Sequence, residues 1–354
     1  MRQVARAVRT AVVILNWNTL EHLQRWLPGL LASVDGRDAE VIVADNASTD
    51  GSAEYVKSSF PGVRLMQFER NLGFTGGYNR ALGQIGDAEF FVLINSDVDV
   101  RPGWLKPLEA WMDNNPDCAV CGPKIHALDC AQGPDGQLLY SRSGRFEYAG
   151  AAGGYIDHYG YPFCRGRVLS RTEEDRGQYD TPADVQWVSG ACMMVRSSVW
   201  KESGGLDGRF FAHMEEIDLC LRVIGKGLRV CVVPDSTVWH LGGGTLPQSS
   251  PFKLKLNYRN SLLMMRKSMP GARVFVRMML DGAAACAYLL QGKPAYFKAV
   301  WDAHMEARKL QEDTRSDFVP GPMDRIRIIP LALVKGKKVF KYLKDYEDSH
   351  SRCR

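Results

Sequence analysis

The chain has 354 residues, of which 45% are hydrophobic, and its net charge is +5 at pH 7. It is too long for one minimal domain and too short for three, and its apolar content is ordinary for a chain that buries a core. So mild a charge gives no argument for a nucleic-acid partner, and none is expected.

The first part of the chain alternates apolar strands with helical segments. The spacing of apolar residues predicts helices at 20–31 and 75–82, and strands at 11–15, 40–44, 63–68 and 90–94. Strands separated by helices favour right-handed βαβ units. We therefore expect an α/β fold with a mostly parallel central sheet flanked by helices.

The second part of the chain is less regular. From about 124 to 180 the periodicity is weak, which indicates an excursion of loops and hairpins beside the sheet. Further on, the pattern predicts a helix at 215–224 and strands at 185–195 and 228–233, the last ending at Pro234. Beyond Pro251 the chain reads as helical to about Leu310. These patterns predict a catalytic domain over 1–250 and a helical extension over 251–354.

The cysteines of the chain indicate a reducing compartment. Most of the nine cysteines lie in apolar runs, as buried free thiols do in a reducing compartment. Cys118 and Cys121 form a C-x-x-C near Cys130 and His126, but ordinary thiols explain it more simply than zinc.

No targeting or membrane-spanning segment is evident. The apolar run at 11–15 is too short for the core of a signal peptide. The run at 274–290 is interrupted by Arg277 and Asp281, which favours a buried or interfacial helix. The chain is therefore expected in the cytoplasm.

Three polar loops follow predicted strands, where ligands bind in α/β sheets. They begin with Asn16-Trp17, with Asp45-Asn46 and with Asn95-Ser96. Asp45 could accept the imino N–H of a pyrimidine, with Trp17 as a stacking surface. The simpler alternative for the second loop is a helix cap at Ser48–Asp50, although it does not explain the acid at the strand end.

Asp97 and Asp99 stand one residue apart directly after the fourth strand. Two carboxylates at this spacing can point to one side of an extended segment and offer hard oxygen ligands to Mg²⁺ or Mn²⁺. The alternative is a solvated turn. His240, beside a glycine-rich loop at the last strand end, is a candidate third ligand.

Two further segments carry candidate residues. Asn71 and Gly73 begin a glycine-rich turn into a helix, which is not a dinucleotide fingerprint because it does not follow the first strand. Glu215 and Glu216 stand at a helix start, where acids interact well with the helix dipole. A general base in a sugar pocket is the functional alternative.

Taken in order, these segments resemble family-2 inverting glycosyltransferases of the GT-A fold, and more narrowly their rhamnosyltransferase-like branch. The resemblance spans about 11–245 and rests on the stretches VVILNWN, VADNASTDGS, NLGFTGGYNRAL, INSDVDV, VSGACMMVR, HMEEIDLCLR and VWHLGGGT. Each stretch is weak alone, but together and in register they are specific.

The resemblance implies a role for each candidate. The donor nucleotide would contact Asn16, Trp17, Asp45, Asn46, Asn71, Gly73, Ser96 and Asp97. The metal would contact Asp97, Asp99 and His240, with Asp99 as the direct ligand. Glu216 falls on the catalytic base of a pair that is usually Glu-Asp, and Glu215 remains a rival.

The implied reaction moves a sugar from a nucleoside diphosphate to a hydroxyl of a glycan or lipid-linked acceptor, in cell-surface polysaccharide or glycolipid assembly. The resemblance favours dTDP-rhamnose, while UDP-linked donors, including a galactofuranosyl donor, stay open. A nucleotidyltransferase would need a basic glycine-rich loop after the first strand. A glycosidase would need no metal motif, and an inactive nucleotide-sugar-binding module is the non-enzyme alternative.

The C-terminal segment is basic and partly apolar. Seven cations with no intervening acid occupy 325–344, interleaved with apolar residues from Ile326 to Leu343. Such a segment can lie on an anionic membrane surface. The alternatives are a solvated basic face, or a helix packed on its own domain or on a second subunit of a homo-oligomer.

Overall fold

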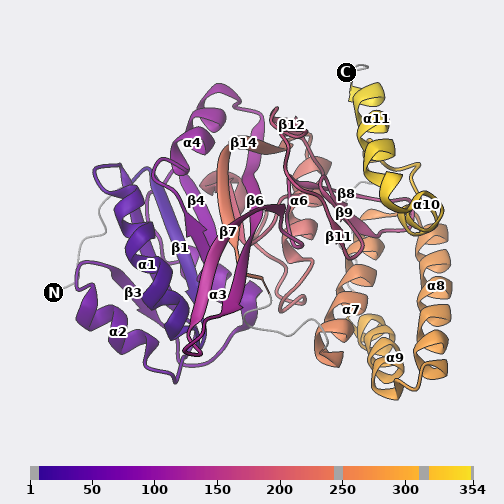
Figure 1. The fold of residues 1–354 in the computed structure, drawn as a ribbon, viewed down its shortest axis with the longest axis horizontal. Coiled ribbons are helices and arrows are strands. Elements are labelled where there is room, and N and C mark those ends of the chain that lie inside the picture. Colours follow the sequence, from indigo (N-terminus) through magenta and orange to yellow (C-terminus); the bar gives the residue numbers. More distant parts are fainter. Residues whose placement is uncertain (1–7, 243–249, 311–318, 352–354) are drawn as a thin grey trace.

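The computed structural model describes residues 8–242, 250–310 and 319–351. Part of the glycine-rich loop after His240, namely 243–245, lies outside these ranges. The sheet and the helices that cover it form one side of the molecule in Figure 1, and the C-terminal helices form the other.

The N-terminal half of the central sheet follows the expected pattern. Its parallel strands are β1 (Thr10–Asn16), β2 (Ala39–Asp45), β3 (Arg64–Gln67) and β4 (Phe90–Asn95). The helices between and after them are α1 (Leu20–Val34), α2 (Ser52–Ser59), α3 (Gly73–Leu82) and α4 (Leu105–Asn114). Helices α1 and α3 confirm the two helices predicted here. Helix α2 corresponds to the helix of the alternative cap interpretation, and α4 was not predicted.

Both faces of this sheet are buried, which explains why its strands are apolar throughout. Val12 and Val92 pack in one hydrophobic cluster with Leu27 of α1. The next residues along the strands, Val13 and Leu93, pack in a second cluster on the opposite face. Alternate side chains of each strand therefore hold a helical layer on either side.

The rest of the sheet departs from prediction in two places. β6 (Cys118–Gln132), β13 (Cys192–Arg196) and β14 (Arg229–His240) complete it, in the order β14-β6-β13-β4. The expected strand 185–195 shortens to β13, preceded by the two-residue β12 (Ala183–Asp184). β14 does not end at Pro234, because an irregularity in its pairing between Val233 and Thr237 accommodates the proline.

The excursion is shorter than expected at its start, because residue 124 lies inside β6. Cys118 and Cys121 are buried free thiols of this strand. A hairpin joins β6 to β7 (Leu138–Phe146). A small second sheet follows, made of β8 (Gly154–Ile156), β9 (Pro162–Cys164), β10 (Arg167–Val168) and β11 (Arg171–Thr172). Loops and hairpins are thus confirmed for the remainder.

The C-terminal part is helical. After α5 (Ser197–Glu202) and α6 (Glu215–Gly225) come α7 (Pro251–Ser268), α8 (Gly271–Leu290), α9 (Pro294–Lys309), α10 (Ile328–Lys335) and α11 (Val339–Ser351). Figure 1 shows α8 at the edge of the molecule farthest from β1. Within the described ranges, no helix combines the length and apolarity needed to cross a bilayer.

The basic C-terminal segment packs on its own domain. Ile326, Ile328, Val339 and Leu343 are buried, so these side chains are not free to face a membrane. Glu347 of α11 is also buried and lies 2.9 Å from Arg165. These buried side chains agree with the alternative of a helix packed on its own domain. Most of the cations of the segment stay exposed.

Candidate functional site

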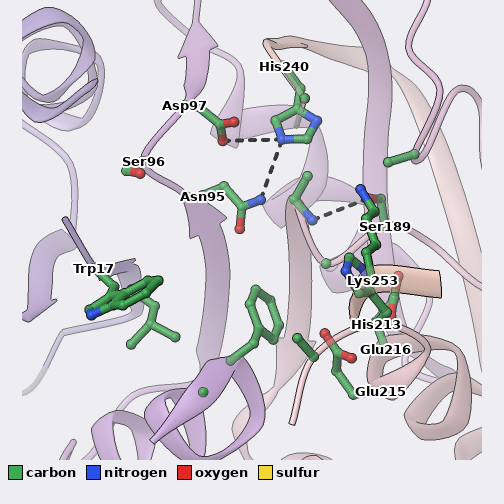
Figure 2. Close-up of a pocket in the computed structure, with 18 of the residues that line it drawn as sticks. Trp17, Asn95, Ser96, Asp97, Ser189, His213, Glu215, Glu216, His240 and Lys253 are labelled. Atoms are coloured by element: carbon green, nitrogen blue, oxygen red, sulfur yellow. Dashed lines mark hydrogen bonds and ion pairs between the residues drawn. The ribbon is translucent and has the colours of Figure 1, made fainter. Parts of the chain in front are cut away.

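A cavity of about 400 Å³ opens at the carboxyl ends of β1, β2 and β4. Figure 2 shows Trp17 on one side of it, Asp97 and His240 along a second, and Glu215 and Glu216 on a third. The cavity therefore lies where the strand-end rule places a ligand in an α/β sheet.

Most of the predicted site residues line this cavity. They are Trp17, Asn46, Asn71, Gly73, Ser96, Asp97, Glu215, Glu216 and His240. Three predicted residues, Asn16, Asp45 and Asp99, are not among the lining residues.

Asn16 and Asp45 support the loops beneath the cavity. The buried Asp45 carboxylate accepts hydrogen bonds from the Asn16 amide at 2.9 Å and from the Ser48 backbone N–H at 3.0 Å. In the same loop, Asp50 accepts from the backbone N–H groups of Leu20 and Ser52, at the starts of α1 and α2. The cap residue of α2 is Gly51 and not one of Ser48–Asp50, but Asp50 binds the first residues of both helices.

Asn46 holds the glycine-rich turn against the end of β2. Its amide nitrogen lies 2.9 Å from Asn71 Oδ1 and 3.1 Å from the Gly73 carbonyl oxygen. Gly73 has φ +71°, and a Cβ there would lie 2.5 Å from the ring of Phe211. Only glycine fits, because the turn approaches the opposite wall of the cavity so closely.

The structure does not bring Asp97 and Asp99 together. Asp99 lies in β5 (Val98–Val100), and its carboxylate accepts two hydrogen bonds from Arg142, at 2.7 and 3.0 Å. Asp97 faces the cavity with Asn95, and both approach His240. Because β5 pairs with β14 next to His240, the strand turns Asp99 away from the cavity.

The His240 ring lies between two buried carboxylates. Its Nε2 is 3.2 Å from Asp97 Oδ1, and its Nδ1 is 3.6 Å from Glu147 Oε1. Burial alone would lower the pKa of His240, but these carboxylates raise it well above its usual value. The raised pKa keeps a proton on His240 between the two carboxylates. A divalent cation held by Asp97 and His240 would replace that proton as their positive partner.

Few groups of the chain itself are available to such an ion. Across residues 8–242, 250–310 and 319–351, no three or more His, Cys, Asp or Glu side chains gather in a metal-binding cluster. Asp97 and His240 line the cavity, and the Asn95 amide and the Glu147 carboxylate lie beside the His240 ring.

Glu215 and Glu216 begin α6 on the opposite wall. Both have a buried Oε2 atom without a hydrogen-bond partner in the described structure. Burial raises the pKa of Glu216 to about 7, and burial, with the charges of Glu216 and Asp218, raises the pKa of Glu215 well above its usual value. With a pKa near neutrality, Glu216, which is the less buried of the two, is poised to accept a proton.

The backbone before α6 has an unusual conformation. Phe211, His213 and Met214 all have positive φ, between 63° and 71°. Such a conformation costs about 1–3 kcal/mol per residue and persists only where the surroundings hold it. The Glu215–Glu216 pair is thus presented by a strained segment.

Helix α7 supplies the groups that hold this segment. The buried Asn260 amide lies 2.7–2.9 Å from the carbonyl oxygens of Phe210, Ala212 and His213. Arg259 donates to the carbonyl of Phe210 at 2.8 Å. These contacts satisfy carbonyls that no helix or strand satisfies.

Sequence reasoning missed several residues that line the cavity. Glu147 and Ser189 come from connecting segments, and Lys253 comes from the first turn of α7. His213 also lines it, and burial, with the charge of Lys253, lowers its pKa to about 4. Ser189 and His213 lie in the stretches VSGACMMVR and HMEEIDLCLR but were given no role of their own, whereas no motif marked Glu147 or Lys253.

Comparison with known proteins identifies the fold family. The model of glycosyl transferase family 2 matches residues 11–199, more than half of the chain. The chain belongs to glycosyl transferase family 2. The expected resemblance is thereby confirmed.

Relatives of this family-2 chain include rhamnosyltransferases. It is 28% identical, over 65% of its own length and 75% of the relative's, to an N-acetylglucosaminyl-diphospho-decaprenol L-rhamnosyltransferase of Mycobacterium tuberculosis. It is 23% identical to the dTDP-rhamnosyl transferase RfbF of Shigella flexneri, over 68% and 76%. These relatives support the rhamnosyltransferase-like branch.

Solved structures confirm the GT-A-type fold of this family-2 chain. S. aureus TarS 1-349, solved with UDP-GlcNAc, superposes with a TM-score of 0.55 at 15% identity, covering 98% of this chain and 93% of that one. GalNAc-T7, solved with UDP, GalNAc and Mn²⁺, gives 0.54 at 16% identity, covering 84% and 55%.

Proposed function

We propose that this chain is an inverting glycosyltransferase that transfers L-rhamnose from dTDP-rhamnose to an acceptor hydroxyl in cell-surface polysaccharide or glycolipid assembly. The observation that carries the proposal is one cavity with Asp97 and His240 along one wall and Glu216 on another. Transfer from a nucleoside diphosphate to an acceptor hydroxyl needs both kinds of wall. One binds a cation beside the diphosphate, and the other accepts a proton from the acceptor.

The wall at the carboxyl ends of the strands, formed by Trp17, Asn46, Asn71, Ser96, Asp97 and His240 and called here the strand-end wall, would bind the donor. Trp17 offers a stacking face, being 38% exposed at the mouth of the cavity, and Asn46, Asn71 and Ser96 offer polar groups. Asp45 and Asn16 would contribute to donor binding indirectly, by holding the shape of the loops beneath the cavity. Asp97 and His240 would hold Mg²⁺ or Mn²⁺, which when bound would neutralise charge on the departing diphosphate.

The opposite wall would bind and activate the acceptor. Glu216 would take the proton of the acceptor hydroxyl as its oxygen attacks the anomeric carbon and the bond to the diphosphate breaks. Attack from the face opposite the leaving group inverts the configuration in one step. The near-neutral pKa of Glu216 suits this role, and Glu216 is the less buried of the two glutamates.

The choice of sugar rests on relatives. Two of them carry rhamnosyl transfer in their names, one with dTDP as the nucleotide. A UDP-sugar donor is the second candidate, because the similar folds of TarS and GalNAc-T7 were solved with UDP compounds. The M. tuberculosis relative is named for a decaprenol-linked acceptor, so we propose a lipid-linked acceptor at the inner face of the membrane here.

Incubation with a panel of nucleotide sugars, with and without Mg²⁺ or Mn²⁺, tests the proposal. We expect dTDP-rhamnose to be consumed only with metal and acceptor present, and NMR of the product to show an inverted anomeric configuration. Consumption of a UDP-sugar instead would favour the second candidate. Donor binding without turnover on any acceptor would indicate an inactive binding module.

A further inference from the structure

Helix α8 has its charged residues inside and its apolar residues outside. Its buried side consists of Val274, Arg277, Asp281 and Ala285, four residues at helical spacing. Arg277 and Asp281 form an ion pair at 2.7 Å within that buried side. The two charges that interrupt this apolar run in the sequence are thus hidden from solvent.

The exposed side of α8 carries no charged residue from 274 to 290. Its exposed large side chains are Phe275, Val276, Met278, Met279, Leu280, Leu289 and Leu290. Phe275 and Met279 lie one turn apart and are 65% and 63% exposed. An apolar surface of this extent marks an interaction site, since isolated exposed apolar residues are ordinary but a whole helix face is not.

Exposed cations flank both ends of this face. Arg273 in the first turn of α8 forms an ion pair with Asp324, which brings the segment before α10 beside that end. That segment and α10 continue with the exposed cations Arg325, Arg327, Lys335, Lys337 and Lys338. Lys293 is exposed just beyond the other end.

We propose that the exposed face of α8 is a docking surface for an anionic lipid bilayer, with the helix lying flat in the interface. An apolar centre between cationic ends matches acyl chains under anionic headgroups. A symmetric contact between two copies would bring the same cationic ends towards each other, which disfavours a second copy as the occupant.

The proposal rests on the proposed lipid-linked acceptor and gives it a route to the cavity. Phe252 and Lys253, in the first turn of α7, line the cavity, and α7 leads directly into α8. Docking through α8 would therefore place the membrane on the side of the molecule formed by the C-terminal helices, one of which, α7, contributes to the cavity. This surface also differs from the basic segment at 325–344 taken alone, because Ile326, Ile328, Val339 and Leu343 of that segment are buried.

Vesicle flotation of the full chain tests the proposal, with phosphatidylcholine vesicles that contain or lack phosphatidylglycerol. We expect binding to the anionic vesicles, reduced by salt. Phe275→Glu combined with Met279→Glu should weaken that binding at least about tenfold. The matched control is Leu138→Glu with Leu139→Glu, which changes two exposed residues of β7 and should bind as the wild type does.

Three results would overturn docking through α8. The first is no flotation of the wild type, and the second is equal flotation of the α8 variant. The third is a wild-type dimer in sedimentation velocity that the α8 variant turns into monomers without any vesicle binding. Thermal stabilisation by dTDP-rhamnose, measured on the same proteins, tests the proposed function separately, because it needs no membrane.

Discussion

The two walls of the cavity are built in different ways. On the strand-end wall, polar side chains hold one another over short loops, as Asn16 holds Asp45 and Asn46 holds Asn71. On the opposite wall, the strained backbone before Glu215 is held by Asn260, which follows it by more than 40 residues.

The difference separates chemistry from support. The side chains of the strand-end wall line the cavity or stabilise the loops beneath it. Substitutions there should therefore act first on donor binding and turnover. The segment before Glu215 is held by α7 and by the backbone N–H groups of Phe74 and Thr75, which donate to the Phe211 carbonyl oxygen. Substitutions in α7 should therefore act on the base without touching it.

The largest effect should come from removing the metal, which acts on the strand-end wall alone. Excess EDTA is expected to lower turnover by about 10³-fold or more, because neutralising a departing diphosphate amounts to several kcal/mol. Initial rates before and after adding back Mg²⁺ or Mn²⁺ measure this. Undiminished turnover in excess EDTA would show that no metal ion acts at this wall.

The next effect separates the two aspartates. Asp97→Asn should lower kcat about 10²–10³-fold, since it would weaken the binding of the cation that we propose neutralises the leaving diphosphate. Asp99→Asn should have less than about a tenfold effect, because Asp99 binds Arg142 outside the cavity. A larger loss of kcat in Asp99→Asn would indicate that Asp99 is the direct metal ligand, as the family resemblance implied.

Asn260→Ala tests the support of the opposite wall. Leaving buried carbonyl groups unpaired should lower the free energy of unfolding by about 2–4 kcal/mol, measured by urea denaturation. At temperatures where the variant is folded, kcat should fall while the affinity for the donor stays near that of the wild type. Equal loss of donor affinity would show that the two walls are not independent.

The smallest effect concerns pH. Glu216 must be deprotonated to accept a proton, so kcat/KM should rise with pH and level off above about 7, the pKa to which burial raises it. Below that pH the value should fall about tenfold per pH unit. A profile that is flat between pH 5 and 7 would contradict a base of this pKa.

The strand-end wall could be read from the sequence, and the reason is local. Apolar strands followed at once by Asp45 or by Asn95–Asp97 put polar groups at a sheet edge, whatever the rest of the fold. Asp99 could not be placed in this way, since its direction depends on Arg142 of β7. Lys253 could not be placed either, because its helix begins beyond the expected end of the catalytic domain.

Missed secondary structure has a similar origin. Gly122-Pro123 in the middle of β6 is typical of a turn, yet the strand continues because Pro123 pairs in register with Val233 of β14. Likewise, α8 reads as an apolar helix with two disruptive charges. Only the fold shows that Arg277 and Asp281 face inward.

The central claim is that Glu216 accepts the proton while the strand-end wall binds the donor, and steady-state kinetics of Glu216→Gln and Glu215→Gln test it most directly. The account predicts that Glu216→Gln lowers kcat by about 10²–10⁴-fold with donor affinity near normal, and that Glu215→Gln, nearly isosteric with a protonated glutamate, loses far less. A reversed ranking would make Glu215 the base, and loss of donor binding in Glu216→Gln would contradict the division between the two walls.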